Sequence, residues 1–376
     1  MDARKIIASR ALVVLRRGLF VAVAMAGSLT PVSWAAASMQ PTSPAWHARI
    51  VVKGQFADLM GAGTSLYAVS LPSKDPASSG TRVVRVDPTS GKVVATSLVL
   101  PETTAPQFVD GAIWVAGQEL HEATSSHSDF VVSELSASTL RRIRVIRTPL
   151  GPFGEPILAG GPDGMLWVGA EGGTSSCTLR RVNPATGGPN MILVVRVSQY
   201  PCAGITLDTT GRYLYAATSA GSSDEIFKLD ARTGAMISHG FFQAPAVFFT
   251  MVPVASRLWT VGGYPGAQGS LTYMSTSSLK VLANSNVGEK SAGTLPSLGQ
   301  FPLVDYSGGR VWVGSDVNLV CFAPTSPRVL AQVGQGPPTP IVTDSLVVTG
   351  GHLWANADFG LPTGLVRLTS PRTCLS

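Results

Sequence analysis

The phrase Leu166-Trp167-Val168-Gly169 joins an aliphatic residue, a large aromatic residue and small or β-branched residues. An aliphatic residue followed by Trp or Tyr occurs seven times, at Leu66-Tyr67, Ile113-Trp114, Leu166-Trp167, Leu214-Tyr215, Leu258-Trp259, Val311-Trp312 and Leu353-Trp354. The steps between the aromatic residues are 47, 53, 48, 44, 53 and 42 residues. A period of roughly 40–50 residues with several strands per unit is typical of a β-propeller. We therefore expect an all-β fold of seven blades.

The unit around Trp167 contains the signals for four antiparallel strands. We expect strands at Pro156–Ala159, Met165–Ala170, Thr178–Val182 and Met191–Val197. Gly-rich and Pro-rich segments separate the first strand from the second and the third from the fourth, and such residues favour tight turns. The seven large aromatic residues are expected to fill the space between neighbouring blades.

The last unit lacks a fourth strand. It contains three predicted strands, Ile341–Val348, Leu353–Ala357 and Leu365–Thr369, and then the chain ends near Cys374. Ile50-Val51-Val52 reads as a strand with no partner nearby in the sequence. We expect this N-terminal strand to complete the last blade, which would close the ring and remove open sheet ends. The propeller would then span residues 48–376 as a monomer.

Residues 1–37 have the features of a secretory signal peptide. Five basic residues precede or adjoin a short apolar stretch, Gly18–Leu29, and Ala35-Ala36-Ala37 resembles a cleavage site. A retained membrane anchor is the alternative, but 12 apolar residues are fewer than the ~20 that a spanning helix needs. Arg16-Arg17 loosely matches a twin-arginine export signal. We expect a secreted or envelope protein in which residues 38–47 form a flexible lead-in.

The net charge depends strongly on this N-terminal segment. The whole chain carries 28 Lys and Arg against 22 Asp and Glu, a formal charge of +6. Removing residues 1–37 takes away five basic residues and Asp2, which leaves 23 against 21 and a charge of +2. The sequence therefore gives no reason to expect nucleic-acid binding.

Four cysteines, Cys177, Cys202, Cys321 and Cys374, suggest two disulfides in an exported chain. Three connectivities are possible. We favour Cys177–Cys202, because both residues would lie on the same face of neighbouring blades, which leaves Cys321–Cys374 beside the closure. Unpaired buried thiols are the alternative.

The irregular segments between second and third strands are where we expect a ligand, since variable loops on a rigid scaffold often carry function. Glu171, Tyr264 and Asp358 lie in or beside such segments and are candidate ligand-binding residues. His121, Glu122, His127 and Asp129 crowd another, and imidazole and carboxylate groups bind transition metals. The alternative for this last group is a solvated polar loop. No phosphate-binding, zinc-protease or nucleophile-elbow motif is present.

The repeats also resemble a known family, most sharply in blades one, three and four. Pro162-Asp163-Gly164-Met165-Leu166-Trp167-Val168, the stretch Leu179–Gly187, and Pro201-Cys202-Ala203-Gly204-Ile205-Thr206 are similar to the repeats of streptogramin (virginiamycin B) lyases and NHL-type propellers. The resemblance implies a propeller and, for the lyases, metal-assisted catalysis by His and Glu on loops near the axis. Glu171 is the best match to those residues, whereas Ala203 stands where the lyases have a His.

Two functions remain open. The first is a non-catalytic extracellular or envelope module that binds a protein, glycan or small molecule without a cofactor. The second is a metal-assisted lyase or hydrolase that acts on an extracellular small molecule.

Overall fold

The computed structural model describes most of the chain between Ala48 and Cys374. The described residues are 48–71, 80–101, 106–120, 128–150, 155–161, 164–171, 176–182, 191–219, 224–242, 248–263, 269–285, 295, 303–315, 318–334, 342–357, 363–368 and 374. The proposed signal peptide and lead-in therefore lie outside the described residues. No helix in the described part of the chain is long and apolar enough to cross a membrane.

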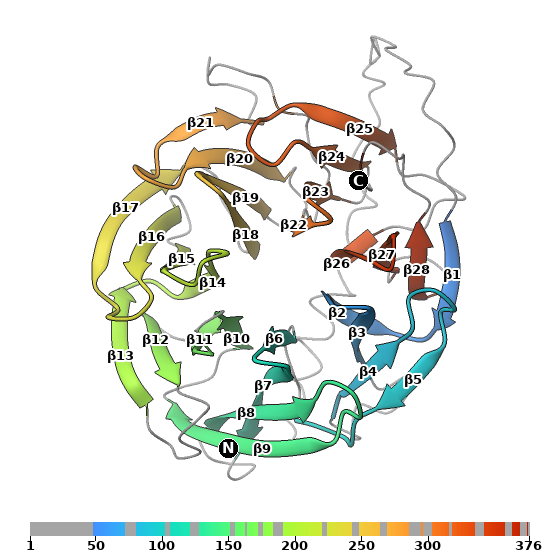
Figure 1. The fold of residues 1–376 in the computed structure, drawn as a ribbon. Coiled ribbons are helices and arrows are strands. Elements are labelled where there is room, and N and C mark those ends of the chain that lie inside the picture. Colours follow the sequence, from blue (N-terminus) through green and yellow to red (C-terminus); the bar gives the residue numbers. More distant parts are fainter. Residues whose placement is uncertain are drawn as a thin grey trace, which may run out of the picture.

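The described residues form seven four-stranded antiparallel blades arranged in a ring, as Figure 1 shows. The first strand of each blade lies nearest the centre of the ring and the fourth lies outermost. Blade 1 contains β2 (Phe56–Ala62), β3 (Ser65–Ser70), β4 (Arg82–Val86) and β5 (Val93–Thr96). Blade 2 contains β6 (Gln107–Val109), β7 (Ala112–Leu120), β8 (Ser128–Ser136) and β9 (Arg142–Leu150).

The remaining blades repeat this arrangement. Blade 3 contains β10 (Glu155–Gly160), β11 (Leu166–Glu171), β12 (Cys177–Val182) and β13 (Met191–Ser198). Blade 4 contains β14 (Cys202–Leu207), β15 (Tyr213–Ser219), β16 (Asp224–Asp230) and β17 (Met236–Phe242). Blade 5 contains β18 (Phe248–Val254), β19 (Arg257–Gly263), β20 (Ser270–Ser275) and β21 (Val281–Asn284). Blade 6 contains β22 (Leu303–Ser307), β23 (Arg310–Gly314), β24 (Asn318–Phe322) and β25 (Val329–Gly334). Blade 7 contains β26 (Val342–Thr349), β27 (His352–Ala357), β28 (Gly364–Leu368) and β1 (Ala48–Lys53).

The ring closes through the N-terminal strand, as the sequence predicts. β1 pairs with β28 in antiparallel register, with Ile50 opposite Val366 and Val52 opposite Leu365. A second connection lies nearer the axis, where Ser345 Oγ accepts a hydrogen bond from Leu59 N at 2.8 Å. The buried amide of Asn356 donates to Phe56 O at 3.0 Å. Blades 7 and 1 are therefore joined both at the outer strand and at the inner strands.

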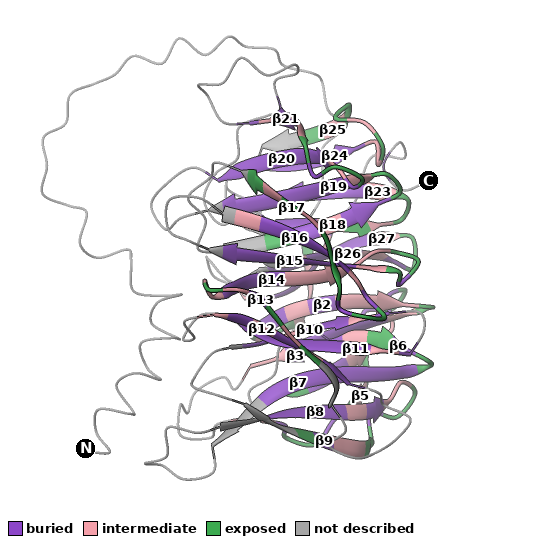
Figure 2. Ribbon diagram, turned by 90° about the vertical axis from the view of Figure 1, so that its left-hand side faces the viewer, coloured by how far each residue is buried: buried purple, intermediate pink, exposed green. Residues whose placement is uncertain are grey.

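The seven repeated aromatic residues are buried, which confirms their predicted packing role. Trp259, for example, packs in one apolar cluster with Val304 and Val311 of the next blade. The burial colours in Figure 2 show the same pattern throughout the ring, with buried residues concentrated in the middle strands of the blades. Burying a large aromatic side chain stabilises a fold by roughly 1.5–3 kcal/mol.

Three of these aromatic residues also donate hydrogen bonds to the following blade, a role that the sequence did not reveal. Tyr67 Oη donates to Ala137 O at 2.9 Å, Trp167 Nε1 to Ala231 O at 3.2 Å, and Trp259 Nε1 to Pro324 O at 3.0 Å. Each acceptor lies in the turn between the third and fourth strands of the next blade. We call a bond from one blade to this turn of the next an inter-blade link.

The residue opposite the aromatic on the third strand often provides a second inter-blade link. Lys228, opposite Tyr215, donates to Thr276 O at 2.9 Å. Tyr273, opposite Trp259, donates to Thr325 O. Arg367, opposite Trp354, donates to Thr89 O at 3.0 Å. This position therefore connects blade 4 to 5, blade 5 to 6 and blade 7 to 1.

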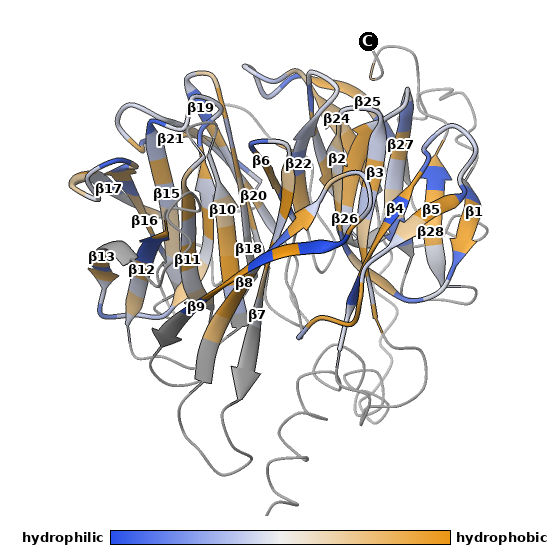
Figure 3. Ribbon diagram, turned by 60° about the horizontal axis from the view of Figure 1, so that its bottom comes forward, coloured by the Kyte–Doolittle hydropathy of each residue, from blue (hydrophilic) through white to orange (hydrophobic). Residues whose placement is uncertain are grey.

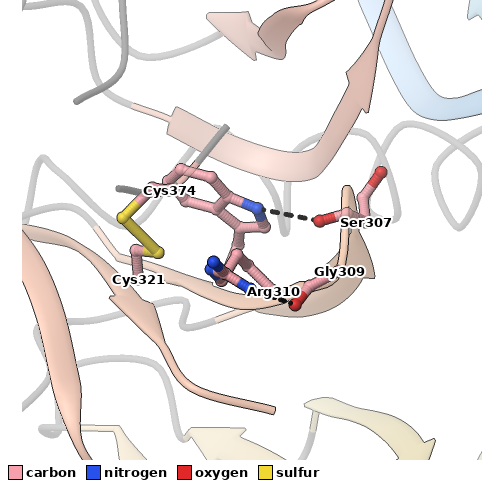
Figure 4. Close-up of a disulfide and its surroundings, with 6 residues drawn as sticks. Ser307, Gly309, Arg310, Cys321 and Cys374 are labelled. Carbon is pink, nitrogen blue, oxygen red and sulfur yellow. Dashed lines mark hydrogen bonds between the residues drawn. A yellow bond between two sulfur atoms is a disulfide. The ribbon is translucent and has the colours of Figure 1, made fainter. Parts of the chain in front are cut away.

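Blade 6 uses a disulfide at the same position. Cys321 lies opposite Trp312 and bonds to Cys374, and both cysteines are buried (Figure 4). Blade 7 takes its fourth strand from the other end of the chain, so no turn joins its third strand, β28, to its fourth strand, β1. Trp312 Nε1 donates within its own blade instead, to Ser307 O at 3.2 Å. The Cys321–Cys374 bond, which agrees with the preferred sequence-based pairing, therefore takes the place of an inter-blade link.

Short side chains cap the turns that receive these links. Asp87 Oδ1 accepts hydrogen bonds from the backbone N–H groups of Thr89 and Ser90 at 2.8 and 3.0 Å. Those bonds, that from Ser90 first, lower the pKa of Asp87 below its ordinary value. Gly91 completes this turn with φ of 72°, and a Cβ there would lie 1.9 Å from Val51 of β1. Asp87 therefore has a structural role in this turn.

Candidate functional site

The strand ends divide the ring into two faces, which are seen edge-on in Figure 2. The turn face carries the connections from first to second and from third to fourth strands, which contain two to eight residues. The loop face carries the connections from second to third strands and between blades, which contain two to 18 residues. The variable lengths therefore gather on one face, where we expected a ligand to bind.

Two of the predicted site residues lie at strand ends on the loop face. Glu171 is the last residue of β11 in blade 3, and Asp129 is the second residue of β8 in the neighbouring blade 2. The structure describes their backbone but not their side chains. The other predicted ligand and metal residues, Tyr264, Asp358, His121, Glu122 and His127, lie outside the described residues.

The strand register brings two further acidic residues beside these positions. Glu155 of β10 is directly opposite Glu171, and Glu119 of β7 is directly opposite Asp129. Like charges placed opposite each other destabilise a sheet unless something neutralises them. Sequence reasoning missed Glu119 and Glu155, because their partners are defined only by the register of the strands.

A disulfide fixes the loop-face end of blade 3 to blade 4. Cys177 and Cys202 are joined with an S–S distance of 2.01 Å and a Cα–Cα distance of 4.5 Å, and both are buried. This is the pairing that the sequence favoured. Cys202 also forms a parallel bridge with Glu171, so the backbone of Glu171 pairs with Glu155 on one side and with Cys202 on the other. Rigid support of this kind is what a binding residue requires.

Asp305 is an ionisable group that the sequence analysis did not single out. It lies on β22, opposite Trp312, where the other blades have Met60, Gln107, Ala159, Thr206, Val252 and Val347. Its Oδ2 atom is buried and has no hydrogen-bond partner in the described part of the chain. Burial raises the pKa of Asp305 to about 7, although a hydrogen bond from the backbone of Tyr306 opposes this shift. The signal in the sequence was a charged residue at an otherwise uncharged repeat position.

Lys228 is a buried cation on the turn face, between blades 4 and 5. Its Nζ lies 3.8 Å from the centre of the Tyr213 ring and 6.0 Å from that of Tyr215. Burial lowers the pKa of Lys228, and the nearby Asp208 carboxylate acts in the opposite direction. Perturbed lysines are often catalytic. Here the equivalent positions of blades 5 and 7 make the same inter-blade link, so we assign Lys228 a structural role.

The described residues contain no group of three or more His, Cys, Asp and Glu side chains that could hold a metal ion. The histidines His121 and His127 and the side chains of the acidic pairs on the loop face are not among these described groups. The metal hypothesis therefore depends on side chains outside the described set.

Comparisons with known proteins support the fold. No family model matches the sequence, and no curated protein matches it. The chain is similar in structure to a chain of hydrazine synthase from Kuenenia stuttgartiensis, with a TM-score of 0.59 and 13% identity over 89% of this chain and 99% of that one. It is also similar to a chain of the mitotic checkpoint complex, with a TM-score of 0.59 and 11% identity over 92% of this chain and all of that one. At these identities the likeness shows the propeller fold alone.

Proposed function

We propose that the protein is an exported binding module whose loop face recognises an extracellular protein, glycan or small molecule. The observation that carries this proposal is the difference between the faces. The short turns of one face serve to link the blades, whereas the other face carries connections of widely different length. We further propose that the repeats are of the streptogramin lyase or NHL type, on the sequence resemblance of blade three.

Export is supported by the N-terminal signal and by the two disulfides, since disulfides persist in oxidising compartments. We propose that residues 1–37 are removed and that residues 38–47 form a lead-in to the propeller. N-terminal sequencing of the protein recovered from the medium or envelope should begin at Ser38. Recovery of the intact chain from the cytoplasm would contradict export.

Binding can be tested by a thermal-shift screen with defined oligosaccharides, peptides and small molecules, since a specific ligand raises the melting temperature. Each hit is then tested on Glu171→Gln, Tyr264→Ala and Asp358→Asn. Arg232→Gln is the matched control, because Arg232 is exposed on the turn face. Loss of the shift in the loop-face variants alone supports the proposal. Equal loss in the control variant would place binding elsewhere.

A second candidate function is a metal-assisted lyase or hydrolase, and the register of blade 2 favours it. Glu119 and Asp129 are opposite each other, and the seven residues between Leu120 and Ser128 include His121, Glu122 and His127. Carboxylate and imidazole groups together are a suitable donor set for a transition metal. These residues would hold the ion, which could polarise a substrate carbonyl or activate water.

Elemental analysis of the purified protein tests this alternative. About one equivalent of a transition metal that is lost in His127→Ala would support a metal centre. His239→Ala is the control, because His239 lies on β17 in blade 4. A protein that binds no metal, or binds it equally in both variants, would leave the binding module as the function.

A further inference from the structure

The outer strand of blade 4, β17, is an open sheet edge that differs from the other six. It contains seven residues, Met-Ile-Ser-His-Gly-Phe-Phe, and none is charged. Its outer edge pairs with no other strand in the described part of the chain. Three of its apolar side chains are strongly exposed: Met236 by 51%, Ile237 by 49% and Phe241 by 59%.

Five of the other six outer strands are charged or short, and both features discourage strand pairing. β9 contains Arg142, Arg144 and Arg147, and its alternation of hydrophilic and hydrophobic residues is visible in Figure 3. β1 contains Arg49 and Lys53, β13 contains Arg196, and β5 and β21 have only four residues each. β25 is also uncharged. Among its described residues, Val329 is the one large apolar side chain that is more than a third exposed. β17 and β25 therefore lack both protections, and of these two β17 exposes the larger number of large apolar side chains among the described residues.

The sequence of β17 also suits pairing with itself. If two copies run antiparallel about a two-fold axis at His239, Met236 lies opposite Phe242 and Ile237 lies opposite Phe241. Ser238 then lies opposite Gly240. Because the strand contains no charged residue, no like charges face each other across the pair. Apolar cross-strand pairs stabilise a sheet, and isologous contacts are the commonest in homodimers.

We propose that β17 is a self-association edge, through which two copies of this chain join their fourth blades into one continuous antiparallel sheet. This departs from the monomer expected from ring closure. Ring closure completes the fold of one chain, but among the described strands none pairs with the outer edge of β17. The contact would keep the loop faces of both copies open for the proposed binding function, on which this inference does not depend.

Sedimentation velocity over a range of protein concentration tests the association. We expect a concentration-dependent dimer in the wild-type protein and at least a tenfold higher dissociation constant in Ile237→Lys. Val94→Lys is the matched control, because Val94 is 50% exposed on the short outer strand β5. A wild-type protein that stays monomeric at all concentrations, or equal effects of the two variants, would overturn the proposal.

Cross-linking tests the register. All four native cysteines are in disulfides, so a single introduced thiol has no partner within its own chain. Across the proposed axis the two copies of position 239 are directly opposite, within the ~7 Å Cα separation that a disulfide requires. His239→Cys should therefore form a covalent dimer on mild oxidation. Met236→Cys should not, because its two copies would be six residue pairs apart, or roughly 20 Å. Equal cross-linking of both variants, or none in either, would contradict this register.

Discussion

Neighbouring blades are bonded differently at two junctions of the ring, the one between blades 4 and 5 and the one between blades 6 and 7. In the first, Lys228 donates to a turn carbonyl of the next blade at 2.9 Å. In the second, Cys321 occupies the equivalent position and forms a disulfide with Cys374 (Figure 4). The difference follows from the order of the chain, because no turn joins the third strand of blade 7, β28, to its fourth strand, β1.

This comparison explains why one face of the ring is uniform. A turn that must present a carbonyl to the preceding blade cannot vary freely in length or conformation. On the loop face the Cys177–Cys202 disulfide joins blades 3 and 4. The other described connections of that face receive none of the inter-blade links, so we expect their lengths to vary at little cost to the ring. Mutations on the turn face should therefore lower stability, whereas those on the loop face should alter binding.

The largest effect is expected when the covalent junction is broken. Cys374→Ser removes a disulfide that joins residues 53 apart in sequence, and chain entropy predicts a loss of about 4 kcal/mol of unfolding free energy. Thermal and chemical denaturation measure this loss, with reductant added to the wild-type protein as a comparison. A loss below about 1 kcal/mol would show that the junction does not need the bond.

A smaller loss is expected at the hydrogen-bonded junction. Lys228→Met keeps an apolar stem but removes the donor to Thr276 O, so the carbonyl loses its charged partner. We expect a loss of about 2 kcal/mol. Arg232→Met removes an equal charge from an exposed position of the same turn face and should change stability by less than about 0.5 kcal/mol. Equal effects would mean that net charge, not the link, is responsible.

The junction of blades 6 and 7 should also respond to pH through Asp305. Its pKa of about 7 in the folded protein exceeds its ordinary value of 3.8, so the folded state keeps a proton that the unfolded state releases. Stability should therefore fall as pH rises from about 4 to 7 and then level off. Asp305→Asn should remove this slope and be more stable at pH 8 by on the order of 1–2 kcal/mol. The same slope in both proteins, measured by melting temperature, would contradict this origin.

The junction of blades 5 and 6 contains a weaker link, the hydrogen bond from Tyr273 to Thr325 O. Tyr273→Phe removes the hydroxyl that donates to Thr325 O but leaves the ring packed beside Trp259. We expect a loss of about 1 kcal/mol, because Trp259 keeps its own bond to Pro324 O. We expect Trp259→Phe to lower the unfolding free energy more in the Tyr273→Phe variant than in the wild-type protein. Denaturation of the single and double variants measures this difference. Simple additivity would indicate that the two links act independently.

The smallest effect on stability is expected on the loop face. Glu171→Gln should change the unfolding free energy by less than about 0.5 kcal/mol, because the backbone of Glu171 is held by its pairing with Glu155 and by its bridge to Cys202. The same variant should reduce binding of any hit from the thermal-shift screen. Strong destabilisation would make Glu171 a structural residue and would weaken the contrast between the two faces.

Much of the fold followed from local patterns. The aromatic spacing predicted seven blades, and the missing fourth strand predicted the pairing of β1 with β28. The inter-blade links were not predicted. The repeated motif indicates that the aromatic side chain is buried, but it does not identify the carbonyl that accepts a hydrogen bond from that side chain. Asp305, Glu119 and Glu155 were missed for a similar reason, since their importance depends on the residue opposite in the sheet. The predicted metal and ligand residues remain predictions.

The most direct test of how the ring is held together is hydrogen–deuterium exchange of the wild-type protein and Cys374→Ser. The account predicts faster exchange in β1 and β28, the strands that close blade 7, with little change in blades 3 and 4. Unchanged exchange in β1 and β28, or an increase spread evenly over all seven blades, would contradict it.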